Sequence, residues 1–127
     1  RPPAPPRPRI LGVDDEPSIG VAVRRVLSRD HAVEIETDPE VALARLREER
    51  FDLVLCDLMM PKLGGPEFHA ELTRLAPDLA RSMIVLTGGA FTASAREFLA
   101  RHENLCIEKP FEVRGLRRAV DAQLRGR

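Results

Sequence analysis

Short apolar runs alternate with amphipathic segments along the chain, and most of the apolar runs end in a polar residue. The runs have the length of strands that are buried on both faces, as in a parallel sheet. In the segments between them, apolar residues recur three and four positions apart, which predicts helices that each pack one face against a sheet. The predicted strands are residues 10–13, 32–36, 51–57, 82–87 and 104–107. The predicted helices are residues 17–28, 39–49, 66–75, 92–101 and 113–124.

This alternation of strands and helices predicts an α/β fold. Pro17, Pro39 and Pro66 each stand where a helix is expected to begin, a position that needs no backbone N–H. Parallel strands joined by right-handed crossovers are the common way to build such a pattern, and helices must then cover both faces of the sheet. We therefore expect one three-layer, doubly wound (βα)5 domain, and the length of 127 residues suits a single core.

The amino-terminal segment has a different composition from the rest of the chain. Five of the 11 prolines fall within residues 1–9, and such a segment favours extended polyproline II structure over a packed core. We interpret residues 1–8 as a linker and residues 9–127 as the folded domain of a longer protein. The 20 basic and 20 acidic residues give no support for nucleic-acid binding. No run of about 18 apolar residues is present to span a membrane, and we expect no membrane contact by this domain.

Polar side chains gather where the predicted strands end: Asp14, Asp15, Asp57, Thr87 and Lys109. The carboxyl ends of parallel strands meet at one edge of a sheet, where ligands of α/β proteins bind. Two carboxylates about 4.5 Å apart repel by roughly 4 kcal/mol at an effective dielectric of about 20. One lysine does not neutralise three of them, so a divalent cation is expected, and Mg²⁺ prefers such oxygen ligands. A raised pKa on one aspartate is the alternative.

A metal, a hydroxyl and a lysine around a carboxylate favour phosphoryl transfer. The metal and Lys109 would balance the charge on the phosphoryl oxygens, and Thr87 would donate a hydrogen bond to one of them. Asp57 would be the nucleophile and would form an acyl phosphate. Glu16 is interpreted as a residue that favours the start of the following helix.

Four motifs stand at these strand ends in order: Asp-Asp-Glu at 14–16, Asp-Leu-Met-Met-Pro at 57–61, Ile-Val-Leu-Thr-Gly at 84–88 and Glu-Lys-Pro-Phe at 108–111. Together they resemble the receiver domain of two-component response regulators over residues 9–125. The resemblance implies a flavodoxin-like fold with strand order 2-1-3-4-5. It also implies a histidine kinase or histidine phosphotransfer domain as partner. By position it makes Asp57 the phosphoacceptor, with Thr87 and Lys109 touching the phosphoryl group. The implied Mg²⁺ ligands are Asp15, Asp57 and the Met59 carbonyl, with Asp14 acting mainly through water.

The two cysteines, Cys56 and Cys106, each lie in an apolar run and are interpreted as reduced core residues. The implied strand order would also place them too far apart for a disulfide. Cys106 occupies a position that is often aromatic in the family, so an aromatic switch coupled to Thr87 is in doubt. His69, on a predicted helix, is interpreted as a surface or partly buried histidine.

The order of segments, a proline-rich linker followed by the domain, resembles the carboxyl-terminal receiver of a hybrid sensor histidine kinase. A stand-alone response regulator is the alternative, and whether the parent chain is an enzyme stays open. A haloacid-dehalogenase-type phosphatase needs Asp-x-Asp, a spacing that Asp14-Asp15 lacks. A scaffold that is never phosphorylated is disfavoured by the intact set of site residues. We expect the domain to be cytoplasmic, and a membrane anchor elsewhere in the parent chain is compatible with this. A homodimer is a further possible partner arrangement.

Overall fold

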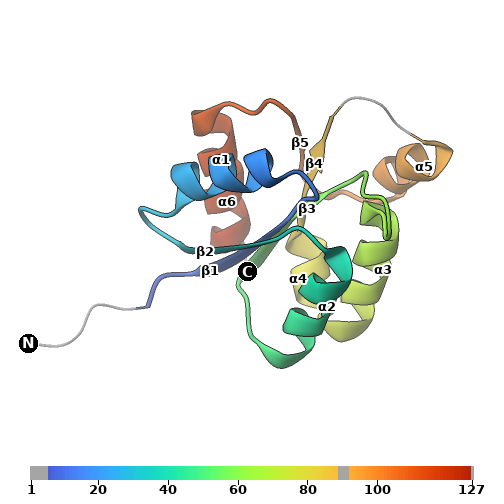
Figure 1. Ribbon diagram of the computed structural model, residues 1–127, viewed down its shortest axis with the longest axis horizontal. Helices are drawn as coiled ribbons and strands as arrows, with labels where there is room; N and C mark the ends of the chain where they lie inside the picture. Colours follow the sequence, from blue (N-terminus) through green and yellow to red (C-terminus); the bar gives the residue numbers. More distant parts are fainter. Residues whose placement is uncertain (1–5, 89–91, 127) are drawn as a thin grey trace, which may run out of the picture.

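The computed structural model describes residues 6–88 and 92–126, and it confirms the doubly wound α/β fold (Figure 1). A parallel five-stranded sheet has the order β2-β1-β3-β4-β5, as the family resemblance implied. Its strands are β1 (Arg9–Val13), β2 (Ala32–Glu36), β3 (Leu53–Asp57), β4 (Ile84–Thr87) and β5 (Cys106–Glu108). The described helices are α1 (Pro17–Leu27), α2 (Pro39–Glu48), α3 (Gly65–Leu75), α4 (Pro77–Ser82), α5 (Ala93–Arg101) and α6 (Val113–Arg125).

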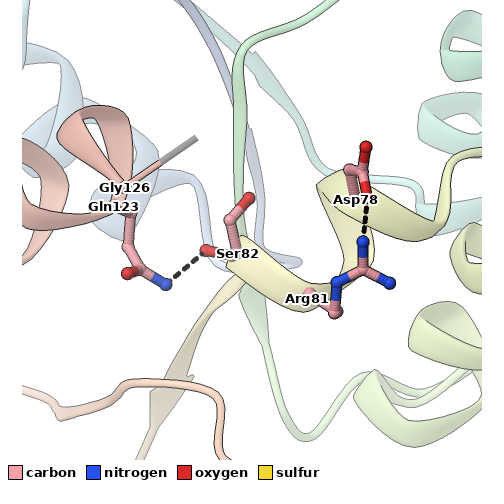
Figure 2. Close-up of a pocket in the computed structure, with 5 residues that line it drawn as sticks. All are labelled: Asp78, Arg81, Ser82, Gln123 and Gly126. Atoms are coloured by element: carbon pink, nitrogen blue, oxygen red, sulfur yellow. Dashed lines mark hydrogen bonds and ion pairs between the residues drawn. The ribbon is translucent and has the colours of Figure 1, made fainter.

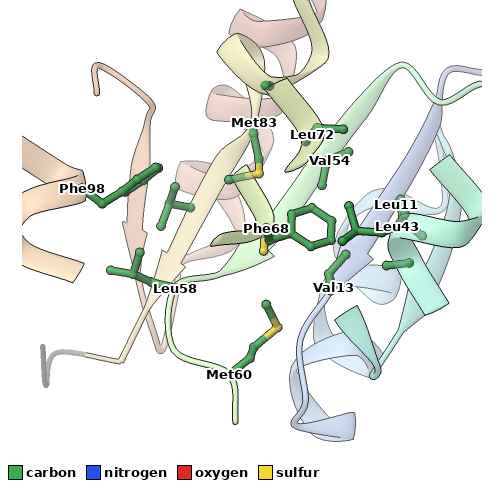
Figure 3. Packing of buried hydrophobic residues seen from close by; sticks show 14 of the residues in the cluster. Leu11, Val13, Leu43, Val54, Leu58, Met60, Phe68, Leu72, Met83 and Phe98 are labelled. Atoms are coloured by element: carbon green, nitrogen blue, oxygen red, sulfur yellow. The ribbon is translucent and has the colours of Figure 1, made fainter. Parts of the chain in front are cut away.

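Side chains of the central strands point alternately into two separate cores, because successive residues of a strand face opposite sides. On one face, Val54 and Cys56 of β3 pack with residues of α2, α3 and α5. Figure 3 shows Phe68 and Leu72 of α3 at the centre of this cluster, beside Val54. On the other face, Leu53 and Leu55 pack against α1 and α6. The buried strand β3 therefore holds its last residue, Asp57, at a fixed place between two cores.

One helix was not expected from the sequence. Residues 77–82 form the short helix α4, with Pro77 in its first turn, in a stretch interpreted as a loop leading to a strand at residue 82. The strand β4 consequently begins two residues later, at Ile84. Six amino acids are too few to show a helical repeat of apolar positions, so the pattern did not separate this helix from a loop.

The prediction that both cysteines lie in the core is right for Cys56 and wrong for Cys106. Cys56 is fully buried in the central strand β3, whereas Cys106 begins β5 and is exposed. The strand β5 lies at the edge of the sheet and has only three residues. Both thiols are free, which confirms that they do not pair.

The described part of the proline-rich segment, residues 6–8, leads into β1 and is hydrogen-bonded to residues just after α1 and at the start of β2. The Pro8 carbonyl accepts a hydrogen bond from Ala32 N at 2.9 Å, and Arg7 donates to the Ser28 carbonyl at 3.2 Å. Residues 1–5 of the predicted linker lie outside the described residues, so the division at residue 9 stays a prediction. Within the described ranges, no helix has the length and apolar character needed to cross a membrane.

Candidate functional site

Three charged side chains meet at the carboxyl ends of β1, β3 and β5. The Lys109 ammonium nitrogen lies 3.1 Å from Asp14 Oδ2 and 3.4 Å from Asp57 Oδ1. The side chains of Asp14, Asp57 and Lys109 are 3%, 5% and 10% exposed. Because the strands are parallel, residues more than 90 positions apart in the sequence converge at this edge of the sheet. The structure therefore brings together the three charged residues on which the predicted chemistry depends.

Asp15 completes a group of three carboxylates. Ligand oxygens of Asp14, Asp15 and Asp57 all lie within 4.8 Å of one another, with Asp15 the most exposed of the three. Carboxylate oxygens at this spacing are the donors that a hard divalent cation prefers. One ammonium does not balance three carboxylates, so the residues present fit a bound divalent cation.

Burial and repulsion act in the same direction on the two inner carboxyl groups. Burial, followed by the charge of Asp14, raises the pKa of Asp57 to about 6, and Lys109 offsets only part of this. Burial also raises the pKa of Asp14. Burial opposes the charge on Lys109, but the hydrogen bond to Asp14 and the charge of Asp57 outweigh it, so the pKa of Lys109 is raised. The site is thus richer in negative charge than its own cation can compensate.

Backbone N–H groups hold both inner carboxylates in place. Glu16 N donates to Asp14 Oδ1 at 2.9 Å, and Met59 N is 3.4 Å from Asp57 Oδ1. The loop after β3 turns back closely enough that Gly65 N donates to the Leu58 carbonyl at 2.9 Å. A Cβ at Gly65 would lie 2.8 Å from Leu58 Cα, so this position needs glycine. The hydrophobic pattern of the sequence gives no sign of this close approach.

Thr87 ends β4, the neighbour of β3, and is 1% exposed. Its carbonyl accepts a hydrogen bond from Lys109 N at 2.7 Å, which fixes the backbone of Lys109 beside β4. Its hydroxyl oxygen lies 3.9 Å from the thiol of Cys106. Thr87 and Lys109 therefore occupy neighbouring strand ends at the edge that carries Asp57.

The surface beside the carboxylates is hollowed. A groove of about 560 Å³ is lined by Asp15, Met59, Lys62 and Thr92, among other residues. It opens next to the three carboxylates, because Asp15 forms part of its wall. A reactant can thus approach the strand ends from the loop that follows β3.

A second hollow, of about 420 Å³, lies away from these groups. Figure 2 shows its lining residues along α4 and at the end of α6. Gln123 donates to the Ser82 carbonyl at 2.9 Å, and Arg81 is paired with Asp78. Ser82 precedes β4, so this hollow is at the amino end of that strand, opposite to Thr87. Its charged groups already pair with each other, and it contributes nothing to the carboxylate site.

The sequence interpretation missed one contact at the site. Glu16 reaches the Lys109 ammonium at 3.6 Å, although it was interpreted only as a residue that favours the start of a helix. Its side chain makes no capping hydrogen bond at the start of α1. The signal in the sequence was its place directly after Asp14 and Asp15.

The comparisons with known proteins agree with this geometry. The family model of the response regulator receiver domain matches residues 10–121. The chain is 32% identical over 118 residues to "Response regulator MprA" of Mycobacterium leprae (strain TN), which is 92% of this chain and 51% of the relative. It is 33% identical over 117 residues to "Sensor histidine kinase AruS" of Pseudomonas aeruginosa, which is 87% of this chain and 11% of the relative. The chain thus spans about half the length of the first relative and a small part of the second.

A solved structure gives the same result for the fold. The response regulator receiver domain protein (CheY-like) from Methanospirillum hungatei JF-1 superimposes with a TM-score of 0.83 and 28% identity. The match covers 94% of this chain and 95% of that one. Because the family model spans the sheet and all the strand-end motifs, the chain belongs to the family of response regulator receiver domains.

Proposed function

We propose that this domain accepts a phosphoryl group on Asp57 from a phosphohistidine in a two-component phosphorelay, in a Mg²⁺-dependent reaction. The observation that carries the proposal is the position of the Lys109 ammonium, 3.1 Å from Asp14 and 3.4 Å from Asp57 in a buried site. The partner would be a histidine kinase or a histidine phosphotransfer domain. Such partners are general for the family, and which of them serves this chain is part of the proposal.

Asp57 would act as the nucleophile. One of its oxygens would attack phosphorus while the P–N bond to the donor histidine breaks and the electron pair stays on the imidazole. A nucleophilic carboxylate must be ionised, and a pKa of about 6 leaves most of Asp57 ionised at neutral pH while making it more basic than an ordinary aspartate. The raised pKa therefore suits this role.

The other site residues would stabilise charge. Lys109 would hold one phosphoryl oxygen through its ammonium, and Thr87 would donate a hydrogen bond to another. Asp15, Asp57 and the Met59 carbonyl would hold Mg²⁺ directly, and Asp14 mainly through water. When bound, the cation would neutralise charge that spreads over the phosphoryl oxygens.

For the parent protein we propose a hybrid sensor histidine kinase in which residues 1–8 are a linker and residues 9–127 are the receiver. The similarity to AruS, named a sensor histidine kinase, supports this setting. The similarity to MprA, named a response regulator, supports the second candidate, a response regulator with its receiver in this chain. The identities of 33% and 32% do not separate the two.

The proposal is tested by phosphotransfer from a phosphorylated histidine phosphotransfer domain. We expect the wild-type domain to become labelled in Mg²⁺ and to lose the label after chelation of the metal. Asp57→Asn should abolish labelling, whereas the matched change Asp121→Asn, at an exposed aspartate of α6, should leave it unchanged. Mapping of the label to Asp14 would instead favour an aspartate-dependent phosphatase. Full labelling of Asp57→Asn would remove the acceptor assignment.

A further inference from the structure

Lys109 faces a third carboxylate besides those of Asp14 and Asp57. Glu16 Oε1 lies 3.6 Å from the Lys109 ammonium nitrogen, against 3.1 Å for Asp14 and 3.4 Å for Asp57. The Glu16 side chain is 61% exposed, whereas those of Asp14 and Asp57 are almost fully buried. Glu16 therefore draws the ammonium towards the solvent side of the site, and the other two draw it inwards.

The backbone of Glu16 is fixed while its side chain is available. Glu16 N donates to Asp14 Oδ1 at 2.9 Å, which locks the residue beside the inner carboxylate. The side chain does not cap α1, so the hydrogen-bonding needs of the helix do not explain a glutamate here. The described contact that uses the Glu16 carboxylate is the ion pair with Lys109.

This arrangement matters when an anionic phosphoryl group enters. The group needs the ammonium of Lys109 as a charge partner, and it must pass a site that already holds the three carboxylates of Asp14, Asp15 and Asp57. Glu16 adds a fourth negative charge and occupies the cation that the phosphoryl oxygens require. Both effects oppose binding of the phosphoryl group.

Resting on the proposed function, we propose that Glu16 is a positioning residue that competes with the phosphoryl oxygens for the Lys109 ammonium. It thereby keeps the affinity of the site for a phosphoryl group below the value that Asp57 and Lys109 alone would give. An exposed ion pair has a modest strength, so its removal is expected to change affinity about two- to fivefold.

The test uses Glu16→Gln, which keeps the shape of the side chain and removes its charge. We would measure the affinity of the domain for beryllofluoride, which stands in for the phosphoryl group, in saturating Mg²⁺. We expect an affinity about two- to fivefold higher than that of the wild type, and a smaller gain at high salt. A gain cannot come from local misfolding, which would only weaken binding.

Glu40→Gln is the matched control, because Glu40 is an exposed acidic residue in the first turn of α2 and has no contact with Lys109 among the described ion pairs. It should leave the affinity unchanged. The same Glu16→Gln change made in a Lys109→Gln variant tests the mechanism: compared with Lys109→Gln alone, the gain should become much smaller, because the part of it that acts through Lys109 is lost. A gain of equal size in the double variant would overturn the positioning role.

An unchanged or weakened affinity in Glu16→Gln, with normal binding by the wild type, would overturn this inference and leave the phosphoacceptor role of Asp57 intact. Failure of the wild type itself to bind beryllofluoride would overturn the proposed function, and this inference with it.

Discussion

Two clusters of charged side chains in this domain perturb their carboxyl groups in opposite directions. In the first, Arg9 and Arg45 bind Glu34 and Glu49 beside the amino ends of β1 and β3. Arg9 lies 2.6 Å from Glu34 and 2.8 Å from Glu49, and Arg45 lies 2.9 Å from Glu49. Both guanidinium groups also approach the ring of Phe51, at 4.3 and 5.4 Å from its centroid. In the second cluster, one lysine faces the carboxylates at the other end of the strands.

The pKa values show the consequence. Hydrogen bonds from Arg45 and Arg9 lower the pKa of Glu49 to about 2, and the same two arginines lower that of Glu34. Burial and the charge of Asp14 raise the pKa of Asp57 to about 6. The guanidinium network is partly exposed, and its two arginines bind the carboxylates of Glu34, Glu36 and Glu49 directly, so it is a structural feature. The strand-end cluster has two buried carboxylates and fewer cations than carboxylates, which fits a site where a bound cation would supply positive charge.

The largest expected effect comes from removing the ammonium of Lys109, which we expect phosphorylation of Asp57 to require. Lys109→Ala should slow phosphorylation of Asp57 about 100-fold, since it removes a charged group that binds the phosphoryl oxygens in the transition state. Single-turnover labelling by a small phosphoramidate measures this rate. Lys62→Ala is the control, because Lys62 is exposed and pairs with Asp38 at 3.3 Å. We expect circular dichroism to show both variants folded, and equal labelling rates for Lys109→Ala and wild type would make Lys109 dispensable.

A second prediction concerns the free energy of unfolding. Removing a carboxylate charge should stabilise the domain in the strand-end cluster and destabilise it in the guanidinium network. Asp57→Asn should stabilise the metal-free domain by about 1–3 kcal/mol at pH 7. The pKa of Asp57 in the folded protein, about 6, lies above its ordinary value of 3.8. Ionised Asp57 therefore opposes folding above about pH 6, and this penalty disappears as the pH falls from 6 towards 3.8.

Urea unfolding in the presence of a chelator measures the effect at several pH values. The difference between Asp57→Asn and wild type should shrink as the pH falls below 6. The control, Glu49→Gln, should destabilise the domain, because it removes a carboxylate that the arginines stabilise. A variant Asp57→Asn that is less stable than wild type at pH 7 would contradict the account of the strand-end cluster.

A third prediction addresses the guanidinium network alone. Arg45→Met keeps much of the side-chain volume and removes the charge that binds Glu34, Glu36 and Glu49. We expect a loss of about 1 kcal/mol in the free energy of unfolding, as is typical of a partly exposed network. Phosphorylation of Asp57 should proceed at the wild-type rate. A large loss of labelling in a folded Arg45→Met variant would show that the two clusters are coupled.

The smallest expected effect concerns the pH dependence of stability that a buried histidine produces away from both clusters. His69 is 7% exposed on α3, and its Nε2 lies 3.1 Å from the Ala80 carbonyl. Burial, then the nearby His102, lowers the pKa of His69 below its ordinary value of 6.5. The unfolded chain therefore binds a proton more readily, and stability is lost as the pH falls through 6.5.

His69→Gln keeps a donor for the Ala80 carbonyl and should remove this part of the pH dependence. Thermal unfolding between pH 7.5 and 5 measures it, and we expect a change smaller than that caused by Arg45→Met. An identical pH profile in His69→Gln would mean that His69 makes no contribution.

Most of the fold was predictable from the sequence, because strands buried on both faces have a clear apolar pattern. β2 was predicted to the residue, and the other described strands were found with shifted ends. The short helix α4 and the exposed position of Cys106 were not predicted. Six residues show no helical period, and a residue in an apolar run cannot be recognised as part of an edge strand until the strand order is known.

The site was predictable in part, for a similar reason. Residues that end strands, such as Asp57 and Lys109, were found because parallel strands place their ends together. The contact between Glu16 and Lys109, the burial of His69 and the close approach at Gly65 depend on how loops and helices pack. Sequence periodicity carries no information on those distances. The chemical roles assigned to the site residues remain predictions; these residues are Asp14, Asp15, Asp57, Met59, Thr87 and Lys109.

In the proposed function, the strand-end carboxylates need an external cation, and Asp57 then takes the phosphoryl group. The most direct test is a titration of the isotope-labelled domain with beryllofluoride, followed by nuclear magnetic resonance with and without Mg²⁺. We predict saturable shifts at Asp14, Asp57, Thr87 and Lys109 that need Mg²⁺ and are absent in Asp57→Asn. Binding that is independent of Mg²⁺, or that persists in Asp57→Asn, would contradict the account.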